Sequence, residues 1–311
     1  MVALLVWNRN FSYMLALIYH PIYSQLALPD GHRYPIQKYQ RLYQAIQSHY
    51  SDELYRCFEP VPLSIEAIKQ VHEENYVNAL VTGTLSAAKM RRIGFPWSES
   101  LIERTLLSAS GTCLTVDKAL ENGSAIHLSG GYHHAHYDFG SGFCLVNDLV
   151  IAAYYGLNKD SIDKVLIIDS DVHHGDGTAT LCADRGDIIT LSFHCDKNFP
   201  ARKPTSDYDV PLAIGTQDNE FLEAFEQIVE MAINHHQPDL IIYDAGVDIH
   251  IDDELGYLNI STEGLYQRDK FMRNITAQKG IPIACVVGGG YRSNHEDLVE
   301  PHLQLIRAFV N

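Results

Sequence analysis

Residues 166–180 read LIIDSDVHHGDGTAT, an apolar run that passes directly into carboxylates and imidazoles. The apolar, β-branched residues at 165–168 predict a buried strand that ends at Asp169. Alternate residues of an extended chain point to the same side, so we expect Asp169, Asp171 and His173 to share one side as the strand ends. Such groups repel and desolvate one another unless a cation lies between them. The stretch therefore predicts a metal site at the end of a strand.

The sequence around this stretch alternates between strand and helix patterns. Apolar, β-branched runs predict strands at 15–19, 125–128, 165–169, 188–193, 240–244 and 283–287. Helical patterns occur at 35–48, 64–80, 98–121, 147–157, 219–236 and 262–279. This order predicts a three-layer α/β fold with a mainly parallel sheet covered by helices on both faces. No linker rich in Pro, Gly or Ser divides the sequence, so we expect one domain over residues 1–311, with 1–14 as an extension.

Composition and charge narrow the classes of function. The chain has 23 basic and 39 acidic residues and a formal net charge of -16, so a direct nucleic-acid partner is not expected. We interpret the acidic surface as a contribution to solubility. The six cysteines are scattered with no CxxC pair, which indicates reduced thiols and a cytoplasmic protein.

The N-terminal segment is apolar, but Asn8, Arg9 and Asn10 interrupt it. No small-residue cleavage site follows a clean apolar run, and no segment reaches about 18 uninterrupted apolar residues. We therefore expect neither a signal peptide nor a membrane span, and the first strand is predicted only after this segment.

Polar residues and glycines follow four of the predicted strands. The sequence SGGYHHAH follows strand 125–128, AGVDIH follows 240–244 and GGGYR follows 283–287, in addition to SDVHHGDG after 165–169. In open parallel sheets, ligands bind beyond the carboxyl ends of the strands. The four segments are therefore expected to meet in one site.

Three of these polar residues form a candidate metal-ligand set. A catalytic metal site needs about three protein ligands and one open position. Asp171 and His173 supply two ligands, and Asp248 is the best-placed third ligand. Carboxylate and imidazole ligands suit Zn²⁺, with Fe²⁺ as the alternative.

The adjacent histidines His133 and His134 are candidates for proton transfer. They follow a strand and two glycines, and a neutral imidazole near a metal-bound water is a suitable general base. A general base of this kind needs a partner on its other nitrogen to fix the tautomer. Asp169 and Asp176 are the carboxylates available for that role.

Five motifs, GGYHHA, GFC, DSDVHHGDG, AGVD and GGGY, occur in this order between residues 19 and 294. On this ordered set, the sequence resembles the zinc-dependent histone deacetylase family of the arginase/deacetylase superfamily. The segments HRYPIQKYQRLYQAI, IGFPWSESL and DELGYLNISTEGLYQRD look most like its class IV and related bacterial members. The resemblance implies one catalytic domain with the arginase/deacetylase fold and a parallel sheet of about eight strands. It also implies that Asp171, His173 and Asp248 bind zinc.

The resemblance further implies the roles of five catalytic residues. His134 matches the general base and acid, with Asp176 behind it. His133 matches its companion, which stabilises charge, with Asp169 behind it. Tyr291 matches the tyrosine that donates a hydrogen bond to the scissile carbonyl.

Four other residues match positions that contact the substrate in the family. The backbone carbonyl of Gly142 matches the acceptor for the substrate amide N–H, and Phe143 and Phe199 match the aromatics that line the acyl-lysine tunnel. Leu255 matches the position that gates the pocket, where a glutamate accompanies acetylpolyamine substrates. Leucine there favours lysine side chains, but Glu254 is adjacent, and a shift of one residue would reverse this inference.

Two features lie outside the catalytic set. The family binds potassium beneath the zinc, and the equivalent atoms are the main-chain carbonyls of Asp169, Asp171 and His173 with the Ser192 hydroxyl. The segment ARKPTSDYDVPL, which follows Phe199 and Pro200, lacks the glycine-rich turn of many relatives. We therefore expect the rim of the pocket to differ there.

The predicted reaction is hydrolysis of an N-acyl amide by a metal-activated water, with an acyl-lysine side chain of a protein or peptide as the substrate. One alternative is a small acyl-amine substrate such as an acetylpolyamine. A second is a binuclear manganese ureohydrolase of the arginase type, although Asp244 and Asp248 are four residues apart and do not form the DxD pair of that class. A third is an acyl-lysine binding module without catalysis. The sequence leaves the acyl length, the oligomeric state and the choice between zinc and iron open.

Overall fold

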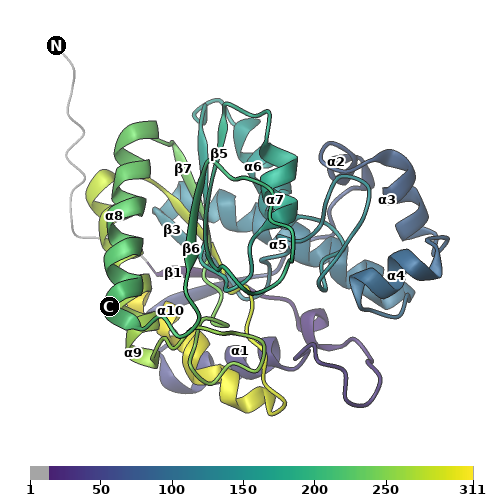
Figure 1. Ribbon diagram of the computed structural model, residues 1–311, viewed down its shortest axis with the longest axis horizontal. Helices are drawn as coiled ribbons and strands as arrows, with labels where there is room; N and C mark the ends of the chain where they lie inside the picture. Colours follow the sequence, from purple (N-terminus) through teal and green to yellow (C-terminus); the bar gives the residue numbers. More distant parts are fainter. Residues whose placement is uncertain (1–13, 311) are drawn as a thin grey trace.

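A computed structural model of the chain describes residues 14–310, so all but the last residue of the predicted extension 1–14 lies outside the described residues. The described residues contain one eight-stranded sheet in the order β2-β1-β3-β8-β7-β4-β5-β6, and every neighbouring pair is parallel (Figure 1). The strands are β1 (Leu15–Ile18), β2 (Tyr55–Phe58), β3 (Ser124–His127), β4 (Val165–Asp169), β5 (Ile188–Cys195), β6 (Tyr208–Leu212), β7 (Leu240–Asp244) and β8 (Ile283–Val286).

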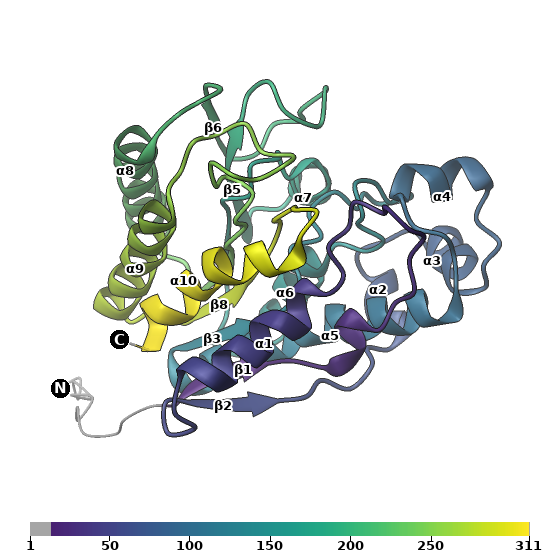
Figure 2. The ribbon, with the colours of Figure 1, turned by 90° about the horizontal axis from the view of Figure 1, so that it is seen from below.

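Helices cover both faces of this sheet. They are α1 (Lys38–His49), α2 (Ile65–Lys69), α3 (Glu74–Val81), α4 (Ala87–Ile93), α5 (Glu99–Asn122), α6 (Asp148–Leu157), α7 (Asp176–Cys182), α8 (Asp218–His236), α9 (Thr262–Lys279) and α10 (Val299–Val310), with short 3-10 helices η1 (Pro21–Ser24) and η2 (His295–Leu298). Helices α5, α6 and α7 pack on one face, and α8, α9, α10 and α1 form the layer on the other (Figures 1 and 2). Helices α2, α3 and α4 gather beyond α5 at one end of the molecule (Figure 1). The predicted three-layer α/β fold with a parallel sheet is therefore confirmed.

The interior strands are the ones that the sequence pattern predicted. Strands β4 and β7 are buried at every residue and have the predicted bounds. Both strands that the pattern missed, β2 and β6, lie at the edges of the sheet. Strand β6 carries Asp209 and Pro211, and residues 208–211 alternate between partly exposed and exposed. Such residues are compatible with an edge strand, because its backbone pairs with a neighbouring strand on one side only.

The helix predictions were right for the long amphipathic segments and wrong at four places. The predicted helix 64–80 is two helices, because the chain breaks after α2 and Glu73 then caps α3 by accepting the N–H of Tyr76 at 2.7 Å. Helices α4, α7 and α10 were not predicted. Helix α7 begins at Asp176, inside the DSDVHHGDG motif. It was not predicted because the polar residues and glycines of this motif give no helical pattern of apolar residues.

Parallel pairing brings the carboxyl ends of the central strands to one edge of the sheet. Asp169 at the end of β4 is in register with Asp244 at the end of β7, and Asp244 is in register with Val286 of β8. The polar segments that follow these strands are therefore side by side. All six cysteines are free, and none of the described helices has the length and apolar character needed to cross a bilayer.

Candidate active site

Asp171, His173 and Asp248 meet at the edge where β4 and β7 end. The Nδ1 of His173 lies 2.9 Å from Oδ1 of Asp171 and 3.1 Å from Oδ2 of Asp248. One ligand atom from each residue lies within 4.8 Å of the other two, so the group could hold a metal ion. The structure thus brings together the three residues that the sequence predicted as ligands.

The electrostatics of this group are those of a cation site. All three side chains are buried. Burial, followed by the charge of Asp171, raises the pKa of Asp248 to about 8. Burial disfavours the charged form of His173, but hydrogen bonds to the two carboxylates outweigh it and raise its pKa to about 10. Without a metal, protons on His173 and Asp248 therefore offset the negative charge of the two carboxylates. A divalent cation bound by the same three side chains would offset this charge in their place, and the ligand types suit it.

Glycine in the GGGY motif allows the backbone to approach these ligands. The N–H of Gly289 donates to Oδ2 of Asp171 at 3.1 Å, and the N–H of Val172 donates to Oδ1 of Asp248 at 2.9 Å. A Cβ atom at Gly289 would overlap the carboxylates of both aspartates. The glycine therefore holds the ligand oxygens in place because it has no side chain.

The histidine pair lies beside the metal-ligand group, and each imidazole has its own carboxylate. Nδ1 of His133 lies 2.7 Å from Asp169, and Nδ1 of His134 lies 2.6 Å from Asp176. The two Nε2 atoms are 3.1 Å apart. Asp176 also accepts from His136, which the sequence reasoning did not single out. The predicted pairing of carboxylates with bases is present in the structure.

Their surroundings give the two imidazoles opposite protonation states. Burial, followed by the charge of the neighbouring His133, lowers the pKa of His134 to about 3. Burial also acts against a cationic His133, but the charges of Asp169 and Asp171 outweigh it and raise its pKa well above the usual range. These shifts favour a neutral His134 and a cationic His133.

A cleft of about 370 Å³ opens above His134 and His173. Phe143, Phe199 and Tyr291 are among the residues that line it. The Phe199 ring stands at right angles to His134, with centroids 4.8 Å apart, and the Tyr291 ring lies 6.1 Å from those of His173 and Phe143. Burial, with the charges of Asp171 and Asp248, raises the pKa of Tyr291 well above its usual value, so its hydroxyl stays protonated.

Gly142 and Phe143 have unusual backbone conformations beside the cleft. Both lie in the left-handed region, with φ of 53° and 67°. A Cβ atom at Gly142 would lie only 2.6 Å from the His134 ring, so the close approach requires glycine. A phenylalanine at positive φ costs about 1 kcal/mol or more, and such strain gathers at functional sites. The N–H of Phe143 donates to the carbonyl of Ile93 at 2.7 Å, which fixes this conformation.

Leu255 and Glu254 both line the cleft. Asn198 donates to the carbonyl of Leu255 at 2.8 Å. The carboxylate of Glu254 accepts from the N–H and the hydroxyl of Ser293 at 2.7 and 2.8 Å. Leu255 is half-buried, whereas Glu254 is exposed and its carboxylate is bonded to Ser293. Leu255, the residue predicted to gate the pocket, is therefore the more enclosed of the two.

Two charged residues near the site, the buried Lys38 and the half-buried Asp253, were not predicted from the sequence. Lys38 donates to the carbonyl of Gly288 at 2.8 Å, and burial lowers its pKa to about 8 although Asp248 and Asp171 are near. Asp253 accepts the N–H groups of Tyr291 at 2.6 Å and Leu255 at 2.8 Å, and burial raises its pKa to about 6. Lys38 lies in a helical pattern and Asp253 in an acidic loop, so neither had a distinguishing signal.

Asp244 completes a second group of metal-binding character. One ligand atom each from His133, Asp169 and Asp244 lies within 4.8 Å of the others. Neither oxygen of Asp244 has a hydrogen-bond partner among the described residues. Burial and the charges of two neighbouring aspartates raise its pKa well above the usual value.

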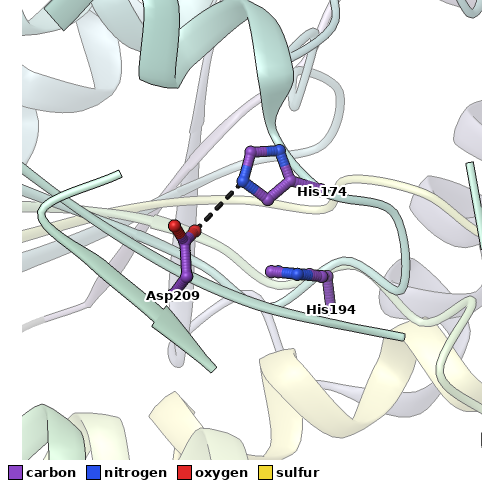
Figure 3. A group of neighbouring side chains, drawn as sticks. All are labelled: His174, His194 and Asp209. Carbon is purple, nitrogen blue, oxygen red and sulfur yellow. Dashed lines mark hydrogen bonds and ion pairs between the residues drawn. The ribbon is translucent and has the colours of Figure 1, made fainter. Parts of the chain in front are cut away.

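His174, His194 and Asp209 form a third such group behind the site (Figure 3). Nε2 of His174 lies 3.0 Å from Asp209, and the rings of His174 and His194 are nearly perpendicular with centroids 4.6 Å apart. The N–H of His174 donates to the carbonyl of Phe199 at 3.4 Å. Nδ1 of His194 lies 3.1 Å from the Ser192 hydroxyl. This group ties edge strand β6 to the loops that carry His173 and Phe199.

Known proteins resemble this chain along most of its length. The family model of the histone deacetylase domain matches residues 32–305. An uncharacterized protein of Picosynechococcus sp. is 40% identical over 94% of this chain and 97% of its own length. Histone deacetylase 2 of Arabidopsis thaliana is 29% identical over 93% of this chain and 78% of that protein, and acetoin utilization protein AcuC of Staphylococcus aureus is 34% identical over 71% and 62%, respectively. The crystal structure of the HDA15 HD domain shares the fold with a TM-score of 0.80 and 18% identity, covering 96% of this chain and 89% of that chain.

Proposed function

The chain belongs to the histone deacetylase family, and we propose that it is a metal-dependent deacylase that acts on the acyl-lysine side chain of a protein or peptide. The proposal rests on the convergence of two sets of side chains at the base of one cleft. Asp171, His173 and Asp248 can hold a divalent cation. His133 and His134 lie beside them, one imidazole cationic and the other neutral.

The proposed cation is Zn²⁺. Two carboxylate oxygens and one imidazole nitrogen leave the fourth position of a tetrahedral site open, and Fe²⁺ accepts the same ligand types. When bound, such a cation polarises an acyl carbonyl and lowers the pKa of water. The potassium ion implied by the family resemblance would bind below it, near the Ser192 hydroxyl; the backbone of Ser192 is in register with that of Asp169.

The histidines and Tyr291 supply the proton transfers and hydrogen bonds. Because Asp176 accepts from Nδ1 of His134, the lone pair of this imidazole is on Nε2, where it accepts a proton from the attacking water. The same proton then passes to the leaving amine. The cationic His133 and the hydroxyl of Tyr291 stabilise the oxyanion that forms when water attacks, an effect worth several kcal/mol in comparable sites.

The cleft provides the proposed tunnel for the acyl-lysine chain. Phe143 and Phe199 form its apolar walls, and the carbonyl of Gly142 accepts the substrate amide N–H. The position of Leu255 supports a lysine chain over an acetylpolyamine, because the neighbouring Glu254 carboxylate is engaged by Ser293. The six free cysteines support a reducing compartment, and we propose the cytoplasm.

A binuclear ureohydrolase is the second candidate, and the group of His133, Asp169 and Asp244 is the observation that favours it. In that case His133 would be a metal ligand. The deacylase proposal instead uses His133 as a cation paired with Asp169. The number of divalent metal ions bound per chain separates these candidates, because the deacylase requires one and the ureohydrolase two.

The experiment is a turnover assay of metal-loaded protein on lysine peptides that carry acyl groups from acetyl to myristoyl. We expect release of the free lysine peptide, loss of activity on chelation, and recovery when Zn²⁺ is returned. The variant Asp248→Asn is the matched control for loss of a ligand. Binding of acyl peptides without release of product would support the binding-module alternative, and a preference for acetylspermidine would overturn the lysine assignment.

A further inference from the structure

A second pocket lies directly beside the candidate cleft. It has a volume of about 480 Å³ and shares Gly142, Phe143 and Phe199 with the cleft. Arg92 at the end of α4 and Arg202 in the segment after Phe199 both line it. The two pockets are therefore adjacent, and two arginines line the second of them.

The charges of these two arginines are unbalanced. Both side chains are exposed, and among the described residues neither guanidinium forms an ion pair with a carboxylate. Asp176 is the only carboxylate that lines this pocket, and both of its oxygens accept from imidazoles. The charged residues of α4 are Lys89, Arg91 and Arg92, so no acid from that helix compensates them.

Contacts at both sides hold the arginines at the pocket. The guanidinium carbon of Arg92 lies 3.8 Å from the centroid of the Phe139 ring, a cation–π contact that orients the side chain. The ammonium of Lys203 donates to the carbonyls of Asn198 and Pro200, each at 2.8 Å. Lys203 thereby fixes the short segment that presents Arg202.

The opposite side of the cleft is different. Arg33 lines it together with Glu254, and the charge of Arg33 acts on that carboxylate. The positive excess is therefore confined to the side of Arg92 and Arg202. This excess occurs in a chain whose formal net charge is -16, so it does not follow from the overall composition.

We propose that Arg92 and Arg202 form a subsite for a carboxylate that the substrate carries next to its acyl-amine. The inference rests on the proposed deacylase function and specifies its substrate class. The carboxylate has two chemical sources, an acidic side chain that flanks an acyl-lysine or the free α-carboxylate of a small Nε-acyl amino acid. Polyamines and lysine-rich peptides are disfavoured, because their remaining cations would face two guanidinium groups.

The test uses three acetyl-lysine peptides that differ only in the flanking residues, which are Glu, Gln or Lys. We expect kcat/KM to fall in the order Glu, Gln, Lys, by about fivefold or more from first to last, as two exposed ion pairs allow. The double variant Arg92→Gln/Arg202→Gln should remove this order while leaving the Gln peptide nearly unaffected. Arg56→Gln is the matched control, since Arg56 is also an exposed arginine over a phenylalanine ring but lies on β2. Equal kcat/KM for the Glu and Lys peptides, or a preference that survives in the double variant, would overturn the subsite.

A binding measurement separates failure of the subsite from failure of the proposed function. Fluorescence anisotropy of the same peptides is recorded with chelator present, so that hydrolysis is not required. Tighter binding of the Glu peptide without turnover by metal-loaded protein would support the subsite and contradict the deacylase. Equal binding, or no binding of any peptide, would contradict the subsite. Nε-acetyl-lysine compared with its carboxamide identifies the source: a preference for the free acid indicates the α-carboxylate, and no preference indicates a flanking side chain.

Discussion

At the scale of single residues, the chemistry depends on which groups carry a proton and which of them donate. The neutral His134 and the cationic His133 owe their states to different neighbours, since their rings are adjacent and equally buried. Tyr291 remains a donor because burial beside two carboxylates opposes its ionisation. The candidate site therefore combines a neutral imidazole, a cationic imidazole and a hydroxyl donor, which suit the proposed roles.

The first prediction concerns the Tyr291 hydroxyl. We expect Tyr291→Phe to lower kcat by about 10²–10³, the loss typical of removing one oxyanion donor, because the ring remains but the hydroxyl is gone. Metal content should be unchanged, since Tyr291 is not among the ligands. Steady-state kinetics with metal analysis of the same sample tests this. Wild-type turnover by the variant would remove Tyr291 from the mechanism.

The sequence could predict the site residues whose side chains indicate a function by their type and by their place at the end of a strand. Asp171, His173 and Asp248 were predictable because paired carboxylates and an imidazole at strand ends indicate a metal, and the structure brings them together. Lys38 and Asp253 were not, because their importance comes from burial and from backbone groups of distant segments. Burial of a charge among long-range neighbours leaves no local pattern in the sequence.

At the scale of elements, parallel strands set where the site lies and the loops between them set its shape. The carboxyl ends of β3, β4, β7 and β8 were placed correctly by strand order and apolar pattern. The edge strand β6 was missed, and with it the contact of Asp209 to His174 that supports the loop of Phe199. Apolar periodicity identifies buried strands but not edge strands, because one side of an edge strand faces solvent.

The second prediction concerns the loop that Asp253 organises. Its carboxylate accepts hydrogen bonds from three N–H groups, those of Tyr291, Leu255 and Gly256. An asparagine offers only one acceptor oxygen, and its amide NH2 group is a donor. We expect Asp253→Asn to lower kcat/KM by about tenfold, since one such bond to a charged group is worth about 1.5–3 kcal/mol, while metal content stays at wild-type level. The measurement is kcat/KM on an acyl-lysine peptide.

The matched control for that prediction is the neighbouring residue. Asp252→Asn changes the same charge on an exposed side chain whose carboxylate lies 3.3 Å from Arg292 and 3.8 Å from His250, and it should leave kcat/KM within a factor of two, as for a weak surface pair. If both variants behave alike, the loop effect is one of charge and Asp253 does not position Tyr291.

At the scale of the whole molecule, burial of neutral histidines makes stability depend on pH. Burial lowers the pKa of His72 to about 4, and Nε2 of this imidazole accepts the N–H of Asn147 at 2.9 Å. His127 is likewise buried, with its pKa lowered to about 3. Between these values and about 6.5, the unfolded chain binds protons that the folded chain does not. These two histidines therefore lower the free energy of unfolding as the pH falls through this window, whereas the raised pKa values of Asp248 and Asp253 act in the opposite direction.

The third prediction isolates one of these groups. Each such histidine should reduce the free energy of unfolding of the wild type by about 1.4 kcal/mol per pH unit between pH 6 and 4.5. The variant His72→Gln should lack one of these contributions. Glutamine can accept from Asn147 and donate to the carbonyl of His136, the two contacts of the imidazole. Urea unfolding at several pH values gives the slopes. Identical slopes for variant and wild type would show that His72 is not held neutral by the fold.

The proposed function depends on a single divalent cation bound between Asp171, His173 and Asp248, and a crystal structure with anomalous data at the zinc absorption edge would detect it. We expect one anomalous peak per chain, about 2.0–2.2 Å from one oxygen of each aspartate and from Nδ1 of His173. A peak at His174, His194 and Asp209 alone, or no peak in protein supplied with Zn²⁺, would rule out the proposed cation site. A second peak at His133, Asp169 and Asp244 would favour the binuclear ureohydrolase instead.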